Sequence, residues 1–306
     1  MATDQAPRRP VAAKPDPSYV TTVELTTQNA AAGASDDGVA DVHLLHVPIQ
    51  ACTSDWLIRQ VTEARTDDGG WIVTANLDHL RRMVKDASYR ELCAGASLVV
   101  ADGMPLVWAS RIQGTPLPER VAGSSLISSL SAAAAEHGRS VYLLGGEPGT
   151  AEAAAEVLRQ RHPSLHVAGT YCPPMGFEDD PEPMQAISMK LTQAQPDIVY
   201  VALGSPKQER LIARMRPLLP GAWWMGVGIS FSFLCGDVKR APRWMQRMGL
   251  EWVHRLLQEP RRLARRYLVD DLPFAVRLLG GAAVRRLRRT SEPSAETTKT
   301  TSPARE

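Results

Sequence analysis

Residues 97–126 read SLVVADGMPLVWASRIQGTPLPERVAGSSL, and this stretch decides the expected fold. Leu98–Val100 form a run of three apolar residues, which is typical of a short strand buried on both faces of a sheet. Asp102-Gly103 then provides a turn, and the apolar residues of 104–112 have helical spacing. A strand, a turn and a helix in this order predict an α/β fold that binds its ligands at the carboxyl ends of the strands.

Asp102 stands at the carboxyl end of that expected strand, and its carboxylate has two interpretations. It is a candidate base, or an acceptor for a sugar hydroxyl, because the loops at this end of an α/β sheet carry ligand-binding groups. It is equally a candidate N-cap, because an aspartate before a helix accepts a backbone N–H. This stretch alone does not choose between the two.

Short apolar runs followed by turns and helix-like segments recur along the chain. The alternating run DVHLLHVPI at 41–49 predicts a first strand, and DIVYVAL at 197–203 predicts a buried one. Further strands are expected at 71–74, 140–144, 166–170 and 222–228, with helices at 53–65, 77–87, 124–137, 183–193 and 272–289. We therefore predict a mostly parallel, Rossmann-like sheet flanked by helices, with a basic helical appendage near the C-terminal end.

Composition divides the chain into four expected parts. Residues 1–40 are polar and lack periodicity, which predicts a disordered tail. Residues 41–238 carry the strand and helix patterns of the α/β core, and residues 239–289 are helical and basic. Residues 290–306 are again polar and predict a second disordered tail.

The net charge of +2 is unevenly distributed. Residues 239–290 contain fourteen Lys or Arg against four Asp or Glu, whereas the remainder of the chain carries a net negative charge. Arg, Trp and Leu at helical spacing are typical of a helix that lies on an anionic membrane surface, with Trp at the interface. A helix packed on the body of the protein with a solvated basic face is the alternative.

The four cysteines are widely spaced, without C-x-x-C or a paired Cys/His pattern. This argues against a zinc site and a disulfide framework and favours a reducing compartment. The chain contains no run of 18 apolar residues that would span a bilayer, and its first residues lack the apolar region of a secretory signal.

Six strings in the sequence resemble the WecG/TagA/CpsF family of bacterial glycosyltransferases (glycosyltransferase family 26). They lie at 74–80 (TANLDHL), 101–124 (ADG, then Gly114, Leu117, Arg120, Gly123 and Ser124), 169–177 (GTYCPPMGF), 196–209 (PDIVYVALGSPKQE), 226–236 (Gly228, Phe231 and Gly236) and 240–267 (RAPRW, GLEW and the following Arg, Leu and Tyr positions). The chain departs from the family pattern at His46, where Gly is usual, and at Ser125 and Ser232, where Asp is usual.

The resemblance implies an inverting transfer of a sugar from a UDP-sugar to a polyprenyl-diphosphate-linked saccharide during synthesis of bacterial cell-surface polysaccharide. The sugar is N-acetylmannosamine, its uronic acid or a hexose. The enzyme is then expected in the cytoplasm, peripheral on the inner face of the cell membrane. Its partners are the UDP-sugar donor, the lipid-linked acceptor and the anionic membrane surface, without nucleic acid, and homo-oligomers are possible as in relatives.

The same resemblance implicates five residues in the site: Thr74, Asn76, Asp102, Arg120 and Gln208. We assign Asp102 as the base that removes the proton from the acceptor hydroxyl. The other four are expected to bind substrate. Asn76 has a second interpretation, because it is placed to cap the helix that follows. The nearby His79 is expected to be a packed or solvent-facing side chain.

The leaving diphosphate needs positive partners, and the sequence contains no D-x-D string that would hold a divalent metal. We therefore expect no metal cofactor. Gly145-Gly146 and Gly204, each between a strand and a helix, together with Lys207, are placed to receive phosphate at helix N-termini. Tight βα turns are the alternative for the glycines. Arg255, Arg262 and Arg266 are expected to contact the membrane or the diphosphate of the acceptor.

Two other functional classes compete with this interpretation. One is a nucleotide-dependent enzyme of another class, such as a dehydrogenase or a sugar hydrolase, but the chain lacks G-x-G-x-x-G and a paired-carboxylate motif. The other is a membrane-associated scaffold of polysaccharide assembly that has lost catalysis, which the departures at Ser125 and Ser232 keep open.

Overall fold

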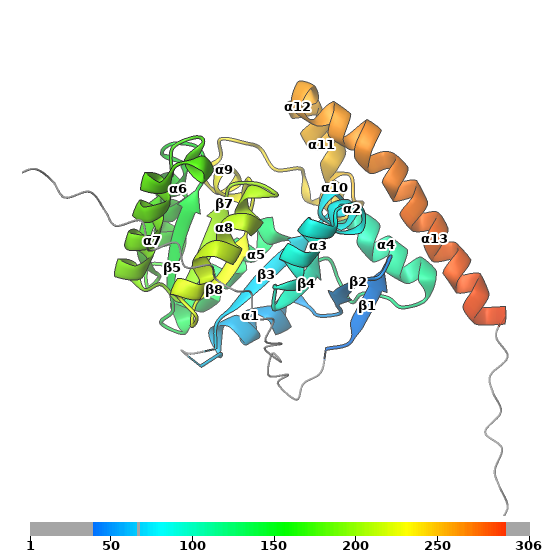
Figure 1. Ribbon diagram of the computed structural model, residues 1–306, viewed down its shortest axis with the longest axis horizontal. Helices are drawn as coiled ribbons and strands as arrows, with labels where there is room; N and C mark the ends of the chain where they lie inside the picture. The colour runs from blue at the N-terminus through cyan, green and yellow to red at the C-terminus, as the bar shows by residue number, and fades with distance from the viewer. Residues whose placement is uncertain (1–38, 66–67, 292–306) are drawn as a thin grey trace, which may run out of the picture. The chain divides into compact units, whose positions relative to one another are not determined.

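The structure is a computed structural model that describes residues 39–65 and 68–291. A six-stranded sheet lies at its centre, in the order β4-β3-β8-β7-β5-β6, and all neighbouring strands are parallel (Figure 1). The strands are β3 (Gly70–Ala75), β4 (Leu98–Ala101), β5 (Ser140–Gly145), β6 (His166–Tyr171), β7 (Ile198–Ala202) and β8 (Trp223–Gly226). The predicted parallel α/β fold is confirmed.

Helices cover both faces of this sheet and form a core on each side. One face carries α2 (Leu77–Lys85), α3 (Ala87–Ala94), α4 (Met104–Gln113), α7 (Pro181–Ala194) and α8 (Lys207–Met215), and α13 (Leu272–Ser291) packs on α4 at this side. The other carries α1 (Ser54–Thr62), α5 (Gly123–Glu136), α6 (Thr150–Arg161) and α9 (Ser230–Cys235). The strands therefore read as nearly continuous apolar runs, because both faces of the sheet are covered.

The expected first strand at 41–49 is wrong, because the chain turns back on itself there. Its two halves form an antiparallel hairpin of β1 (Asp41–Leu44) and β2 (Val47–Gln50), separate from the main sheet. Leu45 and His46 form the two-residue turn with φ of 47° and 62°. Such hairpin turns need positive φ at both central residues. Glycine, the family's usual residue where His46 stands, suits this conformation, and its absence here hides the turn.

The helix expected at 77–87 is present as α2 but ends at Lys85, and a second helix that the sequence analysis did not expect, α3, begins at Ala87. Asp86 breaks the run with an extended conformation, and its carboxylate caps α3 by accepting from the backbone N–H groups of Ser88 and Tyr89. Two further one-turn 3₁₀ helices occur, η2 (Phe177–Asp179) and η3 (Arg216–Leu218).

Residues 239–291, here called the C-terminal segment, contain α10 (Arg243–Arg247), α11 (Glu251–Gln258), α12 (Pro260–Ala264), the π-helical η4 (Arg265–Asp271) and α13. Figure 1 shows α13 running alongside α4. Phe274, Leu278 and Ala282 of α13 are buried in the core on that face. The apolar face of α13 is thus packed on the body of the protein, as the alternative interpretation expected for this part of the segment.

The predicted tails at 1–40 and 290–306 lie outside the described residues, apart from 39–40 and 290–291. Within the described part of the chain, no helix combines the length and the apolar character needed to cross a lipid bilayer.

Candidate active site

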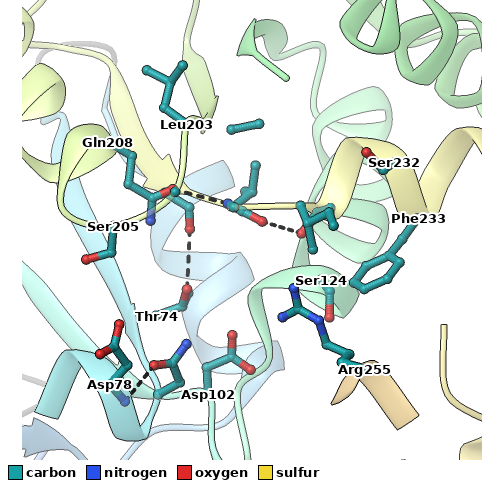
Figure 2. A pocket seen from close by; sticks show the side chains of 18 of the residues that line it. Thr74, Asp78, Asp102, Ser124, Leu203, Ser205, Gln208, Ser232, Phe233 and Arg255 are labelled. Carbon is teal, nitrogen blue, oxygen red and sulfur yellow. Dashed lines mark hydrogen bonds between the residues drawn. The ribbon is translucent and has the colours of Figure 1, made fainter. Parts of the chain in front are cut away.

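A cleft with a volume of about 1410 Å³ opens at the carboxyl ends of the strands. The sheet supplies one wall, and the C-terminal segment supplies the other. Eleven of the twelve predicted site residues line it: Thr74, Asn76, Asp102, Arg120, Gly146, Gly204, Lys207, Gln208, Arg255, Arg262 and Arg266. Figure 2 shows Thr74, Asp102 and Gln208 on the sheet side and Arg255 pointing toward them from the C-terminal segment.

Gly145 is the exception, because it lies beneath the cleft as the last residue of β5. A Cβ atom at this position would stand 2.7 Å from the carbonyl oxygen of Ala202, so the glycine permits close packing of β5 on β7. Gly146 does line the cleft, but its N–H donates to that same carbonyl at 2.7 Å. This N–H is therefore already used within the protein.

Asp102 follows β4 directly, and its carboxylate does not cap the helix behind it. Gly103 occupies the N-cap position of α4 without a side-chain bond. Instead, the N–H of Gly123, at the start of α5, donates to Asp102 Oδ2 at 3.2 Å. This bond fixes the carboxylate at the edge of the cleft, so the N-cap interpretation is wrong for α4.

The surroundings of Asp102 raise the pKa of its carboxyl group toward neutral pH. Loss of solvation by burial raises its pKa from 3.8 to about 7, although the charge of Arg120 and the N–H of Gly123 act in the opposite direction. The negative charge of Glu251 raises the pKa further. A carboxylate with such a pKa is suited to accept a proton at physiological pH.

Thr74, on β3 beside Asp102, contacts both the end of β8 and the start of α5. Its hydroxyl donates to the carbonyl oxygen of Gly226, at the end of β8, with a distance of 3.3 Å. A Cβ atom on Gly123 would stand 2.9 Å from Thr74 Oγ1, so only glycine lets α5 approach this closely. The start of α5, and with it the N–H that holds Asp102, is thereby positioned against β3.

Asn76 caps α2, as one of its two interpretations predicted. Its Oδ1 accepts from the backbone N–H groups of Asp78 and His79 at 3.0 and 3.2 Å, and from the Nδ1 of His79 at 2.8 Å. Because three groups use Oδ1, the orientation of the amide is fixed. Asn76 also lines the cleft, so the cap and the cleft position coexist.

His79, expected to be a packed or solvent-facing side chain, is buried and connects α2 to α8. Its Nε2 lies 3.3 Å from Oε1 of Glu209, which is also buried. Burial acts to raise the pKa of Glu209, but the bonds from His79 and Gln208 bring that pKa below its ordinary value. The ring of His79 therefore bridges two oxygen acceptors, Asn76 and the Glu209 carboxylate.

Gln208 completes this buried network. Its Nε2 donates to Glu209 Oε1 at 2.8 Å, while its Oε1 accepts the N–H of Gly228 at 3.2 Å. The two bonds fix the orientation of its amide beside β8. Sequence reasoning missed Glu209 as a site residue, although it stands next to Gln208 in the family string.

Arg120 and Arg240 both pair with the carboxylate of Glu251, which is the first residue of α11. Arg120 Nη1 pairs with Oε2 of Glu251 at 3.0 Å, and Arg240 Nε pairs with Oε1 of Glu251 at 3.3 Å. Arg240 Nη2 also donates to the hydroxyl of Ser125 at 2.9 Å. Ser125, where the family usually has Asp, therefore helps to attach the C-terminal segment to α5. Ser232, the other such position, lines the cleft.

Lys207, at the start of α8, reaches across the mouth of the cleft. Its Nζ lies 2.5 Å from Oε1 of Glu178 in η2, and this bond lowers the pKa of Glu178. The ion pair connects α8 to the loop Cys172–Phe177, whose residues also line the cleft.

The three arginines expected to face the membrane or a diphosphate differ in their partners. Arg262 Nε pairs with Glu259 at 2.5 Å, and Arg266 pairs with Asp78 at 3.2 Å and with Asp271 at 3.6 Å. The Nε of Arg255 is buried and has no hydrogen-bond partner among the described residues. The Nε of Arg266 also lacks a hydrogen bond, but Arg266 pairs with Asp78 and Asp271. Arg255 is therefore the one of the three that forms no ion pair with the described residues.

Asp78 is the centre of a charge cluster that attaches the C-terminal segment to α2. It is buried and pairs with Arg81, Arg82 and Arg266, while Asp271 pairs with Arg81 and Arg266. Burial opposes ionisation of Asp78, but the arginines still lower its pKa. Burial and the charge of Asp78 raise the pKa of Asp271. No group of three His, Cys, Asp or Glu side chains in the described part of the chain is placed to hold a metal ion.

The chain belongs to the glycosyl transferase WecG/TagA/CpsF family, whose model matches residues 42–289. The match covers the whole sheet, the cleft and nearly all of the C-terminal segment. The chain is therefore a glycosyltransferase, and the resemblance noted in the sequence is confirmed.

Two bacterial proteins are similar to the chain over most of their length. One, from Bacillus subtilis (strain 168), is 32% identical over 208 residues, which are 68% of this chain and 79% of the relative. The other, from Bacillus spizizenii (strain ATCC 23059 / NRRL B-14472 / W23), is 33% identical over 217 residues, which are 71% of this chain and 82% of the relative. Each is named N-acetylglucosaminyldiphosphoundecaprenol N-acetyl-beta-D-mannosaminyltransferase.

Proposed function

We propose that this chain transfers N-acetylmannosamine from a UDP-sugar to an N-acetylglucosamine carried on undecaprenyl diphosphate, with inversion at the anomeric carbon. The sugar and the acceptor are those in the names of the two relatives. The observation that carries the proposal is the convergence of Thr74, Asn76, Asp102, Arg120 and Gln208 on one cleft at the carboxyl ends of the sheet.

In the proposed reaction, Asp102 removes the proton from the acceptor hydroxyl as its oxygen attacks the anomeric carbon. The new carbon–oxygen bond forms while the bond to the diphosphate breaks, and UDP leaves with the electron pair. The position of Asp102 at the cleft edge and its pKa of about 7 support this role, because a general base works best when its pKa lies near the working pH.

Asn76 and Gln208 are proposed to bind the sugar or the nucleotide through the parts of their amides that the protein leaves unused. Their orientation is fixed by the Asn76–His79–Glu209–Gln208 chain of hydrogen bonds. Rigid polar groups lose little entropy when a ligand binds. His79 and Glu209 therefore act as positioning residues in this account.

The leaving diphosphate is proposed to lie near Gly204, Lys207 and Arg255. Lys207 is the first residue of α8 and Gly204 lies three residues before it, at the end of the helix where the dipole favours an anion. The unused buried donor of Arg255 faces the cleft from the opposite wall. Preorganised donors of this kind stabilise developing charge more strongly than water does.

The C-terminal segment is proposed to dock the enzyme on the membrane that carries the acceptor. Ten of the fourteen large apolar side chains that are exposed among the described residues lie in this segment. Seven of them stand outside the cleft and are more than 45% exposed: Trp244, Met248, Leu257, Leu268, Val269, Val284 and Leu287. Together with the fourteen basic residues of 239–290, they fit an anionic lipid surface at the cytoplasmic face.

The proposal is tested by incubating the purified full chain with UDP-N-acetylmannosamine and an N-acetylglucosaminyl diphosphate that carries a short alkyl chain. We expect release of UDP that depends on the acceptor, together with a disaccharide product. Other UDP-sugars should react more slowly. Release of UDP without acceptor, or no product with any UDP-sugar, would contradict the proposed transfer.

A further inference from the structure

A second, smaller cavity adjoins the cleft and carries an unusual concentration of positive charge. It has a volume of about 410 Å³ and is lined by Met104, Arg120, Arg243, Gln246 and Arg247. Three of its five lining residues are arginines, and none is acidic. Met104 and Arg120 also line the cleft, so the two spaces share a wall.

The arginines of this cavity differ in how far their charge is already neutralised. Arg120 is paired with Glu251. Arg243 and Arg247 are exposed and make no ion pair with any of the described residues, in contrast to Arg262 and Arg266 of the same segment. They stand four residues apart on α10, which places them on one side of the helix. Two guanidinium groups thus face the cavity without a carboxylate partner.

The position of α10 is fixed against the helix that follows Asp102. Gly249, just beyond α10, has a φ of 71° and contacts the first turns of α4. A Cβ atom on Gly249 would stand 2.7 Å from Met104 Cβ and 2.8 Å from the ring of Trp108, so only glycine permits this approach. The arginine pair is thereby held near Met104, which lies two residues after Asp102.

We propose that this cavity binds the diphosphate of the lipid-linked acceptor. The inference rests on the proposed function. Because an inverting displacement requires attack from the side opposite the leaving group, the acceptor approaches from the other side of the reacting carbon than the leaving UDP. The donor diphosphate is assigned to Gly204, Lys207 and Arg255, so the acceptor needs an anion site of its own, about one sugar ring from Asp102.

The surroundings of the cavity fit a ligand with this chemistry. Guanidinium groups bind phosphate oxygens through paired, charge-assisted hydrogen bonds. Trp244 on α10 and Met248 at its C-cap are each 58% exposed and offer apolar surface where an isoprenoid chain leaves the diphosphate. An acceptor bound here has its sugar toward Asp102 and its lipid toward the membrane.

The test compares two double variants of the full chain with a water-soluble acceptor and no membrane. Arg243→Gln/Arg247→Gln removes the unpaired arginines of the cavity. Arg261→Gln/Arg265→Gln is the matched control, because these two arginines are exposed, lie in the same segment and line neither space. The acceptors are an N-acetylglucosaminyl diphosphate with a short alkyl chain and the same sugar joined to that chain without phosphate.

We expect Arg243→Gln/Arg247→Gln to raise the KM for the diphosphate acceptor by roughly tenfold or more, since each lost charge-assisted hydrogen bond costs about a factor of ten. The KM for the UDP-sugar should stay within about twofold, and the preference for the acceptor with diphosphate should shrink by the same factor. Arg243→Lys/Arg247→Lys should recover part of the loss. The control should resemble the wild type.

Three results would overturn the inference. An unchanged acceptor KM would remove the cavity from the acceptor site. An equal rise in the KM for the UDP-sugar would assign it to the donor. Unchanged kinetics with weaker binding to phosphatidylglycerol vesicles would assign it to a lipid headgroup. In each case the wild type still transfers sugar, whereas failure of the proposed function would leave the wild type itself inactive.

Discussion

The two walls of the cleft are built in different ways. On the sheet side, Asp102, Thr74 and Gln208 are held by hydrogen bonds to the backbone at Gly123, Gly226 and Gly228. On the C-terminal side, Arg240 and Arg266 are held by carboxylates, and apolar side chains remain exposed. Backbone bonds fix groups rigidly, whereas ion pairs can be exchanged for the charges of a ligand or a membrane. The sheet wall therefore suits the chemistry, and the C-terminal wall suits docking of a lipid-borne substrate.

The largest effect is expected from Asp102→Asn on the sheet wall. Loss of the general base should lower kcat by about 100-fold or more, which corresponds to about 2.7 kcal/mol of transition-state stabilisation. Binding of the UDP-sugar, measured by calorimetry, should change little. Asp55→Asn is a control, since Asp55 is exposed on α1 and does not line the cleft. Wild-type turnover in the Asp102 variant would remove that residue from the mechanism.

The next effect concerns the attachment of the C-terminal wall. Asp78→Asn leaves Arg82 without its buried carboxylate and leaves Arg81 and Arg266 with Asp271 alone, and we expect it to lower the free energy of unfolding by about 3 kcal/mol. Urea denaturation of the full chain measures this. Asp270→Asn, in the same π-helical turn as Asp271, should change stability by less than about 0.5 kcal/mol. Equal stability of the two variants would show that the charge cluster does not hold the segment.

A smaller effect is expected when apolar side chains on the C-terminal wall are replaced. Leu257 and Val269 are 75% and 65% exposed, and Leu257→Ser/Val269→Ser should weaken binding to phosphatidylglycerol vesicles by about tenfold, because less apolar surface leaves water. Vesicle flotation measures the bound fraction. Met189→Ser/Leu218→Ser, at exposed sites on the body of the protein, is the matched control. Equal losses in both variants would place membrane contact elsewhere.

The smallest effect links the two walls through Glu251. The negative charge of Glu251 raises the pKa of Asp102, so Glu251→Gln should lower that pKa and move the acid limb of kcat/KM to lower pH, by up to about one unit. The same experiment with Glu259→Gln should leave the limb in place. A shift toward higher pH in the Glu251 variant would contradict the assigned electrostatics.

Much of the sheet wall could be predicted from sequence, because its signals are local. An apolar run, a glycine turn and a helix start identify each strand end, and the cap at Asn76 follows from its place before α2. The turn at Leu45-His46 was hidden, because neither residue is glycine. Positive φ in such residues is uncommon and leaves no pattern in the sequence.

The contacts between distant segments could not be predicted in this way. His79 and Glu209 are in contact although 130 positions separate them in the sequence, and the residues around either one do not indicate this contact. The pairing of Arg266 with Asp78, and the cavity under α10, depend on how the C-terminal segment packs on α2 and α4. In the sequence, Gly249 indicates only a turn. In the structure, its missing side chain leaves the space that Met104 and Trp108 of α4 occupy.

The pH dependence of sugar transfer in a single turnover tests the central claim most directly. At saturating donor and acceptor, the rate of the wild type should rise with pH through a limb near 7 and then level off, because Asp102 must be ionised to accept the proton. Asp102→Asn should be at least about 100-fold slower and lack this limb. A limb that persists unchanged in the variant would show that another group is the base.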